Sequence, residues 1–290
     1  MHHIIVQENN LKKKKNAKKF NTVIGVFEKA GIEYVVHKTN RKGMASEICA
    51  EVTAESGNAV IVMGGDGTLH DVLNGFKNFE CNYMGLIPLG TGNDFAATAG
   101  IPKDAKKAAE IIAANNPRKI DFIELSSGLR SLNAVGMGID VDVLKKAYSG
   151  KNAKKSKYLR SLISCLAKFK SYDFTVRYGG HESRHSGLIA AVGNGRQIGG
   201  GIKTFPQADI TDGYLDLLIA DFISRPKIIG AFIKLMRGKI SKIKQVTAVK
   251  TKAVEFIPHG ENYSIQADGE LYDNVAFCAK IAESKLSFYL

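Results

Sequence analysis

An apolar run, AVIVM at 59–63, leads directly into the glycine-rich sequence GGDGT at 64–68. An uninterrupted apolar run of this length is typical of a strand buried on both faces, as in a parallel sheet. Before it, strand and helix patterns alternate along the chain, at 3–6, 18–30, 33–39 and 45–55. This alternation predicts right-handed crossover connections and an open, mostly parallel α/β sheet.

A second predicted strand, YMGLIPL at 83–89, ends in a second glycine-rich turn, GTGND at 90–94. Ligands of open α/β sheets bind outside the carboxyl ends of the strands, so two such turns predict a site there. Glycine lets backbone N–H groups approach phosphate oxygens, and the helix expected from about Leu69 directs its positive end to the same place. A tight turn with a capped helix is the alternative explanation of each sequence.

Asp66 lies inside the first glycine-rich sequence, where a carboxylate alone would repel phosphate. Its presence is understandable if a Mg²⁺ ion or a polarised hydroxyl lies between the two. The chain contains neither a GxxxxGK[ST] loop nor a GxGxxG fingerprint, so the sequence does not support a P-loop or a dinucleotide-binding turn.

The pattern changes after Asp121. Stretches rich in β-formers, separated by glycine and polar turns, lie at 131–140, 173–180, 187–195, 213–221, 253–260 and 263–270. They predict an antiparallel, sandwich-like or barrel-like second domain. We therefore expect an α/β domain at 1–124 and a β-rich domain at 125–280, with the chain end at 281–290 returning to the first domain.

Two helical patterns interrupt the β-rich region, at 157–170 and 228–236, each with apolar residues along one side. Such a stripe predicts packing on a core. A helix that faces a membrane or closes over a site is the alternative.

The formal net charge of +13 is concentrated in two runs of lysine and arginine. Six lysines lie within 12–19, and nine Lys or Arg residues with no Asp or Glu lie between Arg225 and Lys252. Such surfaces attract nucleic acid, anionic lipid headgroups or phosphorylated substrates. A solvated face explains one run, whereas two runs favour a surface that faces a membrane or phosphate. No nucleic-acid module is recognisable, so we do not expect nucleic acid as a partner.

The four cysteines are far apart and form no CxxC pair, which argues against a zinc site or a disulfide framework. No apolar run approaches the roughly 20 residues that span a bilayer, and the start of the chain lacks a secretory pattern. We expect a cytoplasmic protein that associates peripherally with membranes.

GGDGTLHDVLNG (64–75) followed by PLGTGNDFAATAGIP (88–102) resembles the catalytic domain of the diacylglycerol kinase family. Stretches similar to the bacterial soluble lipid kinases follow in the same order, at 119–125, 133–140, 192–221 and 267–270. GGDGT alone also occurs in NAD kinases and phosphofructokinases. The combination of PLGTGNDFA with the late DGE separates this family from them.

The resemblance implies an ATP-dependent lipid kinase that transfers the γ-phosphate to a lipid hydroxyl, with 1–124 as its ATP-binding catalytic domain. It assigns the ATP phosphates and orientation of Mg²⁺ to Gly64, Gly65, Asp66, Gly67 and Thr68, and further nucleotide contacts to Thr39 and Thr91. Asp66 and Glu270 are the implied catalytic residues, with Glu270 as the general base that deprotonates the acceptor. A hairpin turn is the alternative explanation of the DGE sequence.

The resemblance also implies a second, structural Mg²⁺ at ADITDGY. Its ligands would be the Asp212 carboxylate and the backbone carbonyls of Asp209 and Tyr214, an oxygen-only set that suits a hard cation. Asp94 and Asp121 match carboxylates that reach this ion through water and tie the two domains together. A plain Asp-Gly turn is the alternative.

One segment and two single residues depart from the family. QENNL (7–11) lacks the proline and glycine of the family's NPxSG-like phosphate loop, so nucleotide contacts there depend on the adjoining lysines. Asp71 stands where glutamate is common, and Ala97 where arginine is common. Because the core phosphate loop and the DGE are intact, we expect an active enzyme.

Two other functions stay open: an NAD kinase, and a catalytically silent module that binds nucleotide or lipid. The sequence also leaves open whether the chain forms a homodimer and which lipid accepts the phosphate. Diacylglycerol, monoacylglycerol, a sphingoid base and phosphatidylglycerol are the candidates. The expected partners are the lipid substrate and an anionic membrane surface.

Overall fold

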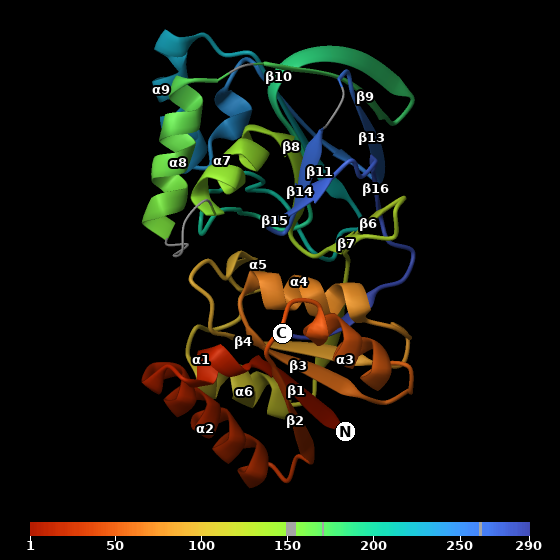
Figure 1. Cartoon of the computed structure of the whole chain (residues 1–290). Helices are drawn as coiled ribbons and strands as arrows, with labels where there is room; N and C mark the ends of the chain where they lie inside the picture. Colours follow the sequence, from red (N-terminus) through yellow and green to blue (C-terminus); the bar gives the residue numbers. More distant parts are fainter. Residues whose placement is uncertain (149–154, 170, 261–262) are drawn as a thin grey trace. The chain divides into compact units, whose positions relative to one another are not determined.

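A computed structural model describes residues 1–148, 155–169, 171–260 and 263–290 (Figure 1). The chain forms two compact units. The first contains Met1–Asp121 together with Glu283–Leu290, and the second contains Phe122–Ala282.

The first unit is built on a six-stranded sheet. Its strands lie in the order β2 (Tyr34–Thr39), β1 (His2–Gln7), β3 (Ala59–Gly64), β4 (Tyr83–Pro88), β17 (Leu286–Tyr289) and β5 (Pro117–Ile120). Every pairing is parallel except that of β17 with β5. All six residues of β3 are buried, as its apolar sequence requires. The prediction of a mostly parallel α/β sheet is therefore confirmed.

Helices cover both faces of this sheet. They are α1 (Glu8–Leu11), α2 (Lys14–Lys29), α3 (Met44–Val52), α4 (Asp66–Gly75), α5 (Asp94–Thr98) and α6 (Ala105–Ala113). Figure 1 shows α3 and α4 on one face and α2 and α6 on the other, and each pair packs side by side.

The helix after the first glycine-rich sequence begins earlier than predicted. The sequence suggested a start near Leu69, but α4 begins at Asp66, with Gly65 as its N-cap. The Leu69 N–H already donates to the Gly65 carbonyl at 3.0 Å. An acidic residue in the first turn favours this earlier start, because it interacts well with the positive end of the helix.

The second unit contains an 11-stranded antiparallel sheet. Its main path runs β15-β14-β8-β10-β9-β13-β16-β6-β7, while β11 pairs with β10 and β12 pairs with β11. The strands are β6 (Ile123–Leu125), β7 (Arg130–Ser131), β8 (Ala134–Gly138), β9 (Tyr172–Tyr178), β10 (His181–Gly193), β11 (Leu215–Asp221), β12 (Val246–Thr251), β13 (Ala253–Pro258), β14 (Ser264–Ala267), β15 (Glu270–Asp273) and β16 (Phe277–Ile281). Inward-facing aromatic residues, among them Phe174, Phe256 and Phe277, form its core. This confirms the predicted β-rich, sandwich-like region.

The second unit also contains helices α7 (Ile139–Tyr148), α8 (Lys155–Ala167) and α9 (Arg225–Met236), with a 3-10 turn at Ile240–Lys242. Helix α8 ends before the predicted limit, and Lys170 lies outside the described residues. Helix α9 begins three residues earlier than predicted, with a proline in its first turn. None of the helices in the described parts of the chain is long and apolar enough to cross a membrane.

Helix α7 was not predicted, because 131–140 was expected to be β-rich throughout. The strand β8 ends at Gly138, and the helix begins at the next residue. Gly138 has a φ of +108°, and a β-carbon there would lie 2.5 Å from the Leu188 carbonyl oxygen. This sharp change of direction depends on a distant strand and is invisible in the local pattern.

Candidate functional site

The carboxyl ends of four parallel strands lie in register at one edge of the first sheet. Thr39 pairs with Gln7 at the ends of β2 and β1, and Gly64 pairs with Pro88 at the ends of β3 and β4. The strand order 2-1-3-4 reverses direction between β1 and β3. In open α/β sheets ligands bind at this point of reversal. The GGDGT sequence lies there, because it begins at the end of β3.

The two glycine-rich sequences touch each other at this edge. A β-carbon built on Gly65 would lie 3.0 Å from the Gly90 α-carbon, and one on Gly90 would lie 2.7 Å from the Gly65 α-carbon. A β-carbon on Gly64 would lie 2.8 Å from the Thr68 β-carbon. The glycines are therefore needed for the close approach of the loops, and together they form one surface of backbone.

Two hydrogen bonds join the loops. The Leu89 N–H donates to the Gly64 carbonyl at 2.7 Å, and the Phe95 N–H donates to Asp66 Oδ1 at 3.3 Å. Asp66 therefore links the start of α4 to the start of α5. The N-terminal N–H groups of α4 give this edge positive character, which suits phosphate.

Asn93 gives the second loop its shape. It adopts the left-handed conformation, with a φ of +52°, and its Nδ2 donates to the Gly90 carbonyl at 2.7 Å. Thr91 is exposed on the same loop, whereas Thr39 and Thr68 are buried. The structure thus brings Gly64–Thr68 and Thr91 together on two touching loops, with Thr39 at the end of a strand along the same edge.

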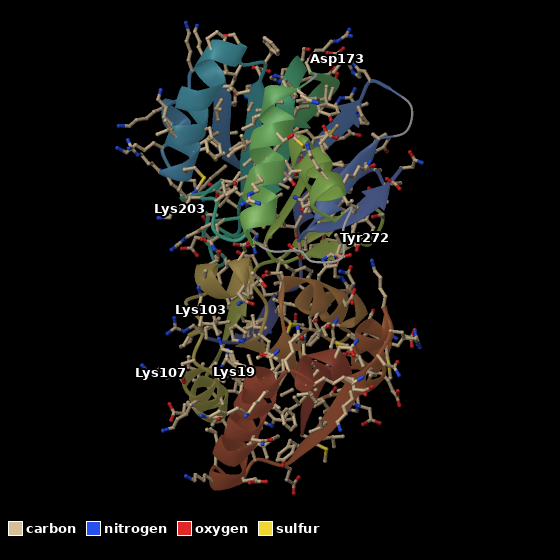
Figure 2. All side chains as sticks on the ribbon, turned by 60° about the vertical axis from the view of Figure 1, so that its left-hand side comes forward. Lys19, Lys103, Lys107, Asp173, Lys203 and Tyr272 are labelled. Carbon is tan, nitrogen blue, oxygen red and sulfur yellow. The ribbon has the colours of Figure 1, made fainter. Side chains whose placement is uncertain are left out.

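Lys19 is a residue of this edge that the sequence did not single out. Its Nζ donates to the carbonyls of Pro88, at 3.3 Å, and Lys103, at 3.2 Å, so it ties α2 to the end of β4. Partial burial, followed by the charge of Lys15, lowers the pKa of Lys19. Figure 2 labels Lys19 and Lys103 beside each other. The lysine run had suggested only a solvated or anion-facing surface.

The QENNL sequence that departs from the family is ordered. Gln7 ends β1, and the next four residues form the short helix α1. Helix α2 then begins at Lys14, with Lys13 as its N-cap. The lysines of this run therefore lie about the N-terminal turn of α2.

Asp121, at the end of the first unit, is fully buried. Lys285 Nζ lies 2.7 Å from its Oδ1. The carboxylate expected to reach toward a metal thus has a lysine ammonium beside it. Asp94 is also buried, in the first turn of α5.

The DGE sequence forms a tight hairpin in the second unit. Ala267 pairs with Glu270, and the two residues between them, Asp268 and Gly269, have φ values of +51° and +88°. Two-residue turns of this type favour Asp-Gly, so these two residues form the turn of a hairpin, which is compatible with a chemical role of Glu270 beside it. Glu270, the first residue of β15, is half-buried.

The acidic loop ADITDGY has its own hydrogen bonds. Asp212 Oδ1 accepts the Tyr214 N–H at 3.0 Å, and its Oδ2 lies 2.8 Å from Lys250 Nζ. Lys250 Nζ lies equally close to Asp216 Oδ2. Partial burial lowers the pKa of Lys250, but these two hydrogen bonds outweigh it and raise the pKa overall.

This loop suits a hard cation by its donor chemistry, since it offers carboxylate and carbonyl oxygens, although both Asp212 oxygens already have partners. A divalent ion at Asp212 would compete with Lys250 for the same oxygen. Within the described residues, no group of three or more His, Cys, Asp or Glu side chains is arranged to hold a metal.

An apolar pocket of about 90 Å³ lies inside the second unit, which the sequence did not predict. It lies between α8, α9 and strands β10 and β11, and its lining includes Leu162, Leu166, Ile189, Leu218, Phe232 and Leu235. Asp140, in the first turn of α7, also lines it, and burial raises the pKa of Asp140 to about 7. The apolar stripes of the two helices were the sequence signal for this pocket.

Comparison with family models accounts for most of the chain. Residues 3–125 match the model described as "Diacylglycerol kinase catalytic domain". Residues 133–289 match the "YegS C-terminal NAD kinase beta sandwich-like domain".

Several bacterial relatives are similar over most of their length. A "Probable lipid kinase YegS-like" of Xanthomonas campestris pv. campestris is 29% identical over 290 residues, which covers 92% of this chain and 90% of the relative. A "Diacylglycerol kinase" of Mycobacterium tuberculosis is 30% identical over 233 residues, covering 78% and 74%.

Solved structures share the fold. A diacylglycerol kinase from Bacillus anthracis superposes with a TM-score of 0.78 at 21% identity, covering 99% of this chain and 96% of that one. An NAD kinase from Archaeoglobus fulgidus, in complex with ATP, gives a TM-score of 0.53 at 15% identity, covering 100% and 94%.

Proposed function

We propose that this chain, which belongs to the diacylglycerol kinase family of lipid kinases, transfers the γ-phosphate of ATP to the hydroxyl group of a lipid at an anionic membrane surface. The observation that supports a lipid as the acceptor is the apolar pocket of the second unit. The observation that supports the nucleotide is the pair of touching glycine loops in the first unit.

ATP binds at the carboxyl edge of the first sheet. Its phosphates contact the backbone of Gly64–Thr68, where a β-carbon on Gly64 would meet Thr68 and one on Gly65 would meet Gly90. Thr91 and Thr39 contact the rest of the nucleotide. Mg²⁺ bound with ATP neutralises charge on the phosphates, and Asp66 helps to orient it.

Glu270 is the general base. As the acceptor oxygen forms its bond to the γ-phosphorus, Glu270 takes the hydroxyl proton, the bond to the β–γ bridging oxygen breaks, and ADP leaves. Phosphoryl transfer needs such a positioned base more than it needs covalent catalysis. The position of Glu270 directly after the Asp-Gly turn, as the half-buried first residue of β15, supports this role.

An acyl chain of the acceptor occupies the pocket between α8 and α9. A pocket of about 90 Å³ has room for only part of one acyl chain. Diacylglycerol is the first candidate, and a sphingoid base, monoacylglycerol and phosphatidylglycerol are the others.

The surface around α8 and α9 faces the membrane. Large apolar side chains are exposed there, namely Ile163 on α8, Phe222 just before α9, and Ile233 and Met236 on α9. The segment from Lys227 to Lys244, which contains most of α9, has six Lys or Arg residues and no Asp or Glu. Each Lys or Arg near an anionic surface contributes on the order of 1 kcal/mol, and salt weakens this attraction.

A structural Mg²⁺ at Asp212, with the carbonyls of Asp209 and Tyr214, is part of the proposal. The oxygen-only donors support it, and Lys250 is its competitor. No catalytic step depends on this ion.

The reaction is tested by transfer of radiolabel from γ-labelled ATP with Mg²⁺ to the candidate lipids in mixed micelles, with NAD as a soluble comparison. We expect label in a lipid, loss of label in Asp66→Asn, and full transfer in the surface control Glu110→Gln. Label only in NAD would favour an NAD kinase. ATP binding without label in any acceptor would favour a silent module, and either result would overturn the proposal.

A further inference from the structure

The carboxylate of Asp268 accepts hydrogen bonds from the short segment that leads into β8. Its Oδ1 accepts the Ser131 hydroxyl at 2.6 Å and the Asn133 N–H at 2.9 Å. The same oxygen accepts the Ala134 N–H at 3.2 Å, and Oδ2 accepts the Leu132 N–H at 3.0 Å. Three consecutive backbone N–H groups thus converge on one carboxylate, as in concave amide sites that bind anions.

These bonds require a carboxylate rather than any polar side chain. Hydrogen bonds to an ionised acceptor are roughly twice as strong as those between neutral groups. An amide at position 268 would direct its own N–H₂ donor toward one of the N–H groups, so at least one bond would become a clash of donors. The Asp268 backbone N–H also donates to the Ala134 carbonyl at 3.0 Å, so both the side chain and the backbone of the residue are hydrogen-bonded to this segment.

Asp268 is one of the two residues in the hairpin turn before Glu270. The turn is further held by Gln266 Oε1, which accepts the Gly269 N–H at 3.0 Å. Strand β14 enters it already paired with β8, through Gln266–Gly136 and Ala267–Val135. The backbone of Glu270 therefore follows a turn that is fixed at its start, at its tip and along the preceding strand.

The segment that holds Asp268 is itself anchored. The Asn133 carbonyl accepts the N–H groups of Asn194, at 2.9 Å, and Gly195, at 2.8 Å. Asn133 Nδ2 donates to the Gln197 carbonyl at 2.6 Å, and a β-carbon on Gly195 would overlap the Asn133 side chain. Asp268 is therefore bound to a rigid part of the sheet and not to a loop that could follow it.

We infer that Asp268 is a positioning residue that fixes the carboxylate of Glu270 for proton abstraction. This inference rests on the proposed function, because it assumes that Glu270 is the base. A general base must lie within hydrogen-bond reach of the proton it removes. A displacement of about 1 Å at a reacting group costs on the order of 10²-fold in rate.

The test compares Asp268→Asn with the wild type in kcat, the KM for ATP and the KM for lipid. The acceptor is the candidate lipid that gains most label in the transfer assay. We expect kcat to fall on the order of 10²-fold while both KM values stay within about twofold, since the lost interaction matters only in the transition state. Asp273→Asn is the matched control, because Asp273 lies at the far end of the same hairpin strand and pairs with Ser264. It should leave kcat unchanged.

A double-mutant cycle separates positioning from a purely structural role. If Asp268 acts through Glu270, adding Asp268→Asn to Glu270→Gln should cause no further loss of rate. A further loss of the same size as in the single variant would overturn the inference.

Ser131→Ala keeps the test valid if Asp268→Asn does not fold. It removes the one side-chain donor and leaves the three N–H groups, so we expect a loss of a few-fold in kcat that Ser131→Thr restores. Unchanged kcat in Ser131→Ala, together with unchanged hydrogen exchange at the Gly269 and Glu270 amides, would also overturn the inference. If Glu270→Gln itself retains full rate, the proposed base fails. If Glu270→Gln loses rate and Asp268→Asn does not, the positioning role of Asp268 is wrong and the proposed base stands.

Discussion

Gly65 and Gly90 approach so closely that a β-carbon on either would reach within 3.0 Å of the other's α-carbon. The two residues come from different loops, and no side chain larger than hydrogen fits between them. Their contact makes one backbone surface out of two separate sequence motifs.

Gly90→Ala should therefore impair ATP binding without unfolding the chain. The new methyl group must push the two loops apart, which moves the N–H groups that face the phosphates. We expect the Kd for ATP, measured by calorimetry, to rise on the order of 10-fold or more, a change of about 1.4 kcal/mol. Gly25→Ala is the control, because its β-carbon meets nothing within 4 Å. Equal ATP affinity in both variants would argue against the loop contact as a binding surface.

The apolar pocket of the second unit, where we propose that the lipid binds, can be filled by a larger side chain. Ala231 lines it on α9, so Ala231→Phe should occupy the space of an acyl chain. We expect the KM for lipid to rise while the KM for ATP is unchanged, because uniform binding of one substrate is lost. Gly230→Ala on the same helix has open space for its methyl group and should change neither constant. A normal KM for lipid in Ala231→Phe would mean that the acceptor binds elsewhere.

Asp140 should make stability depend on pH. Burial raises its pKa in the folded chain to about 7, whereas an unfolded aspartate has a pKa of about 3.9. The folded chain therefore retains this proton where the unfolded chain has lost it. Its stabilising effect is full below about pH 4 and is lost as the pH rises through 7, by at most about 1.4 kcal/mol per pH unit.

Asp140→Asn isolates this effect, since the amide does not titrate. Thermal unfolding of both proteins at pH 5, 6, 7 and 8 should show the wild type losing stability relative to the variant as the pH rises. A constant difference across this range would mean that Asp140 is already ionised at pH 5 in the folded chain.

Lys250 should weaken the binding of any divalent ion at the acidic loop, because both would contact Asp212 Oδ2. In the absence of ATP, we expect Lys250→Met to bind Mn²⁺ roughly fivefold more tightly than the wild type, the effect of about 1 kcal/mol from a partly exposed ion pair. Asp212→Asn should abolish this binding, and Lys252→Met should match the wild type. Treatment with EDTA should then lower the unfolding temperature of Lys250→Met when Mg²⁺ was present before. Identical Mn²⁺ affinities in all four proteins would exclude the proposed ligand set.

The sequence predicts the parallel sheet and the β-rich region well, because buried strands and alternating strands differ in their apolar patterns. Strands β3 and β9 show the two patterns clearly. Local patterns fail where a distant contact decides. Helix α7 starts at Ile139 because Gly138 turns against Leu188, and nothing near residue 139 signals this.

The site was predicted in its parts but not in its connections. The glycine loops, Glu270 and the acidic loop are visible as short motifs. The partners that hold them are not, because they come from far along the chain. Asp268 and Ser131 are 137 residues apart, and Lys19 is 69 residues from Pro88. Hydrogen bonds over such separations follow from the fold and have no sequence pattern of their own.

The rate of γ-phosphate transfer to lipid by Glu270→Gln tests the central claim most directly. Glutamine keeps the size of the side chain but cannot accept the proton. We therefore expect kcat to fall on the order of 10²- to 10⁴-fold, the usual contribution of a general base. The Kd for ATP should be unchanged, because Glu270 belongs to the second unit and the phosphate loops to the first. Transfer at a rate within a few-fold of the wild type would contradict Glu270 as the base and with it the account of catalysis given above.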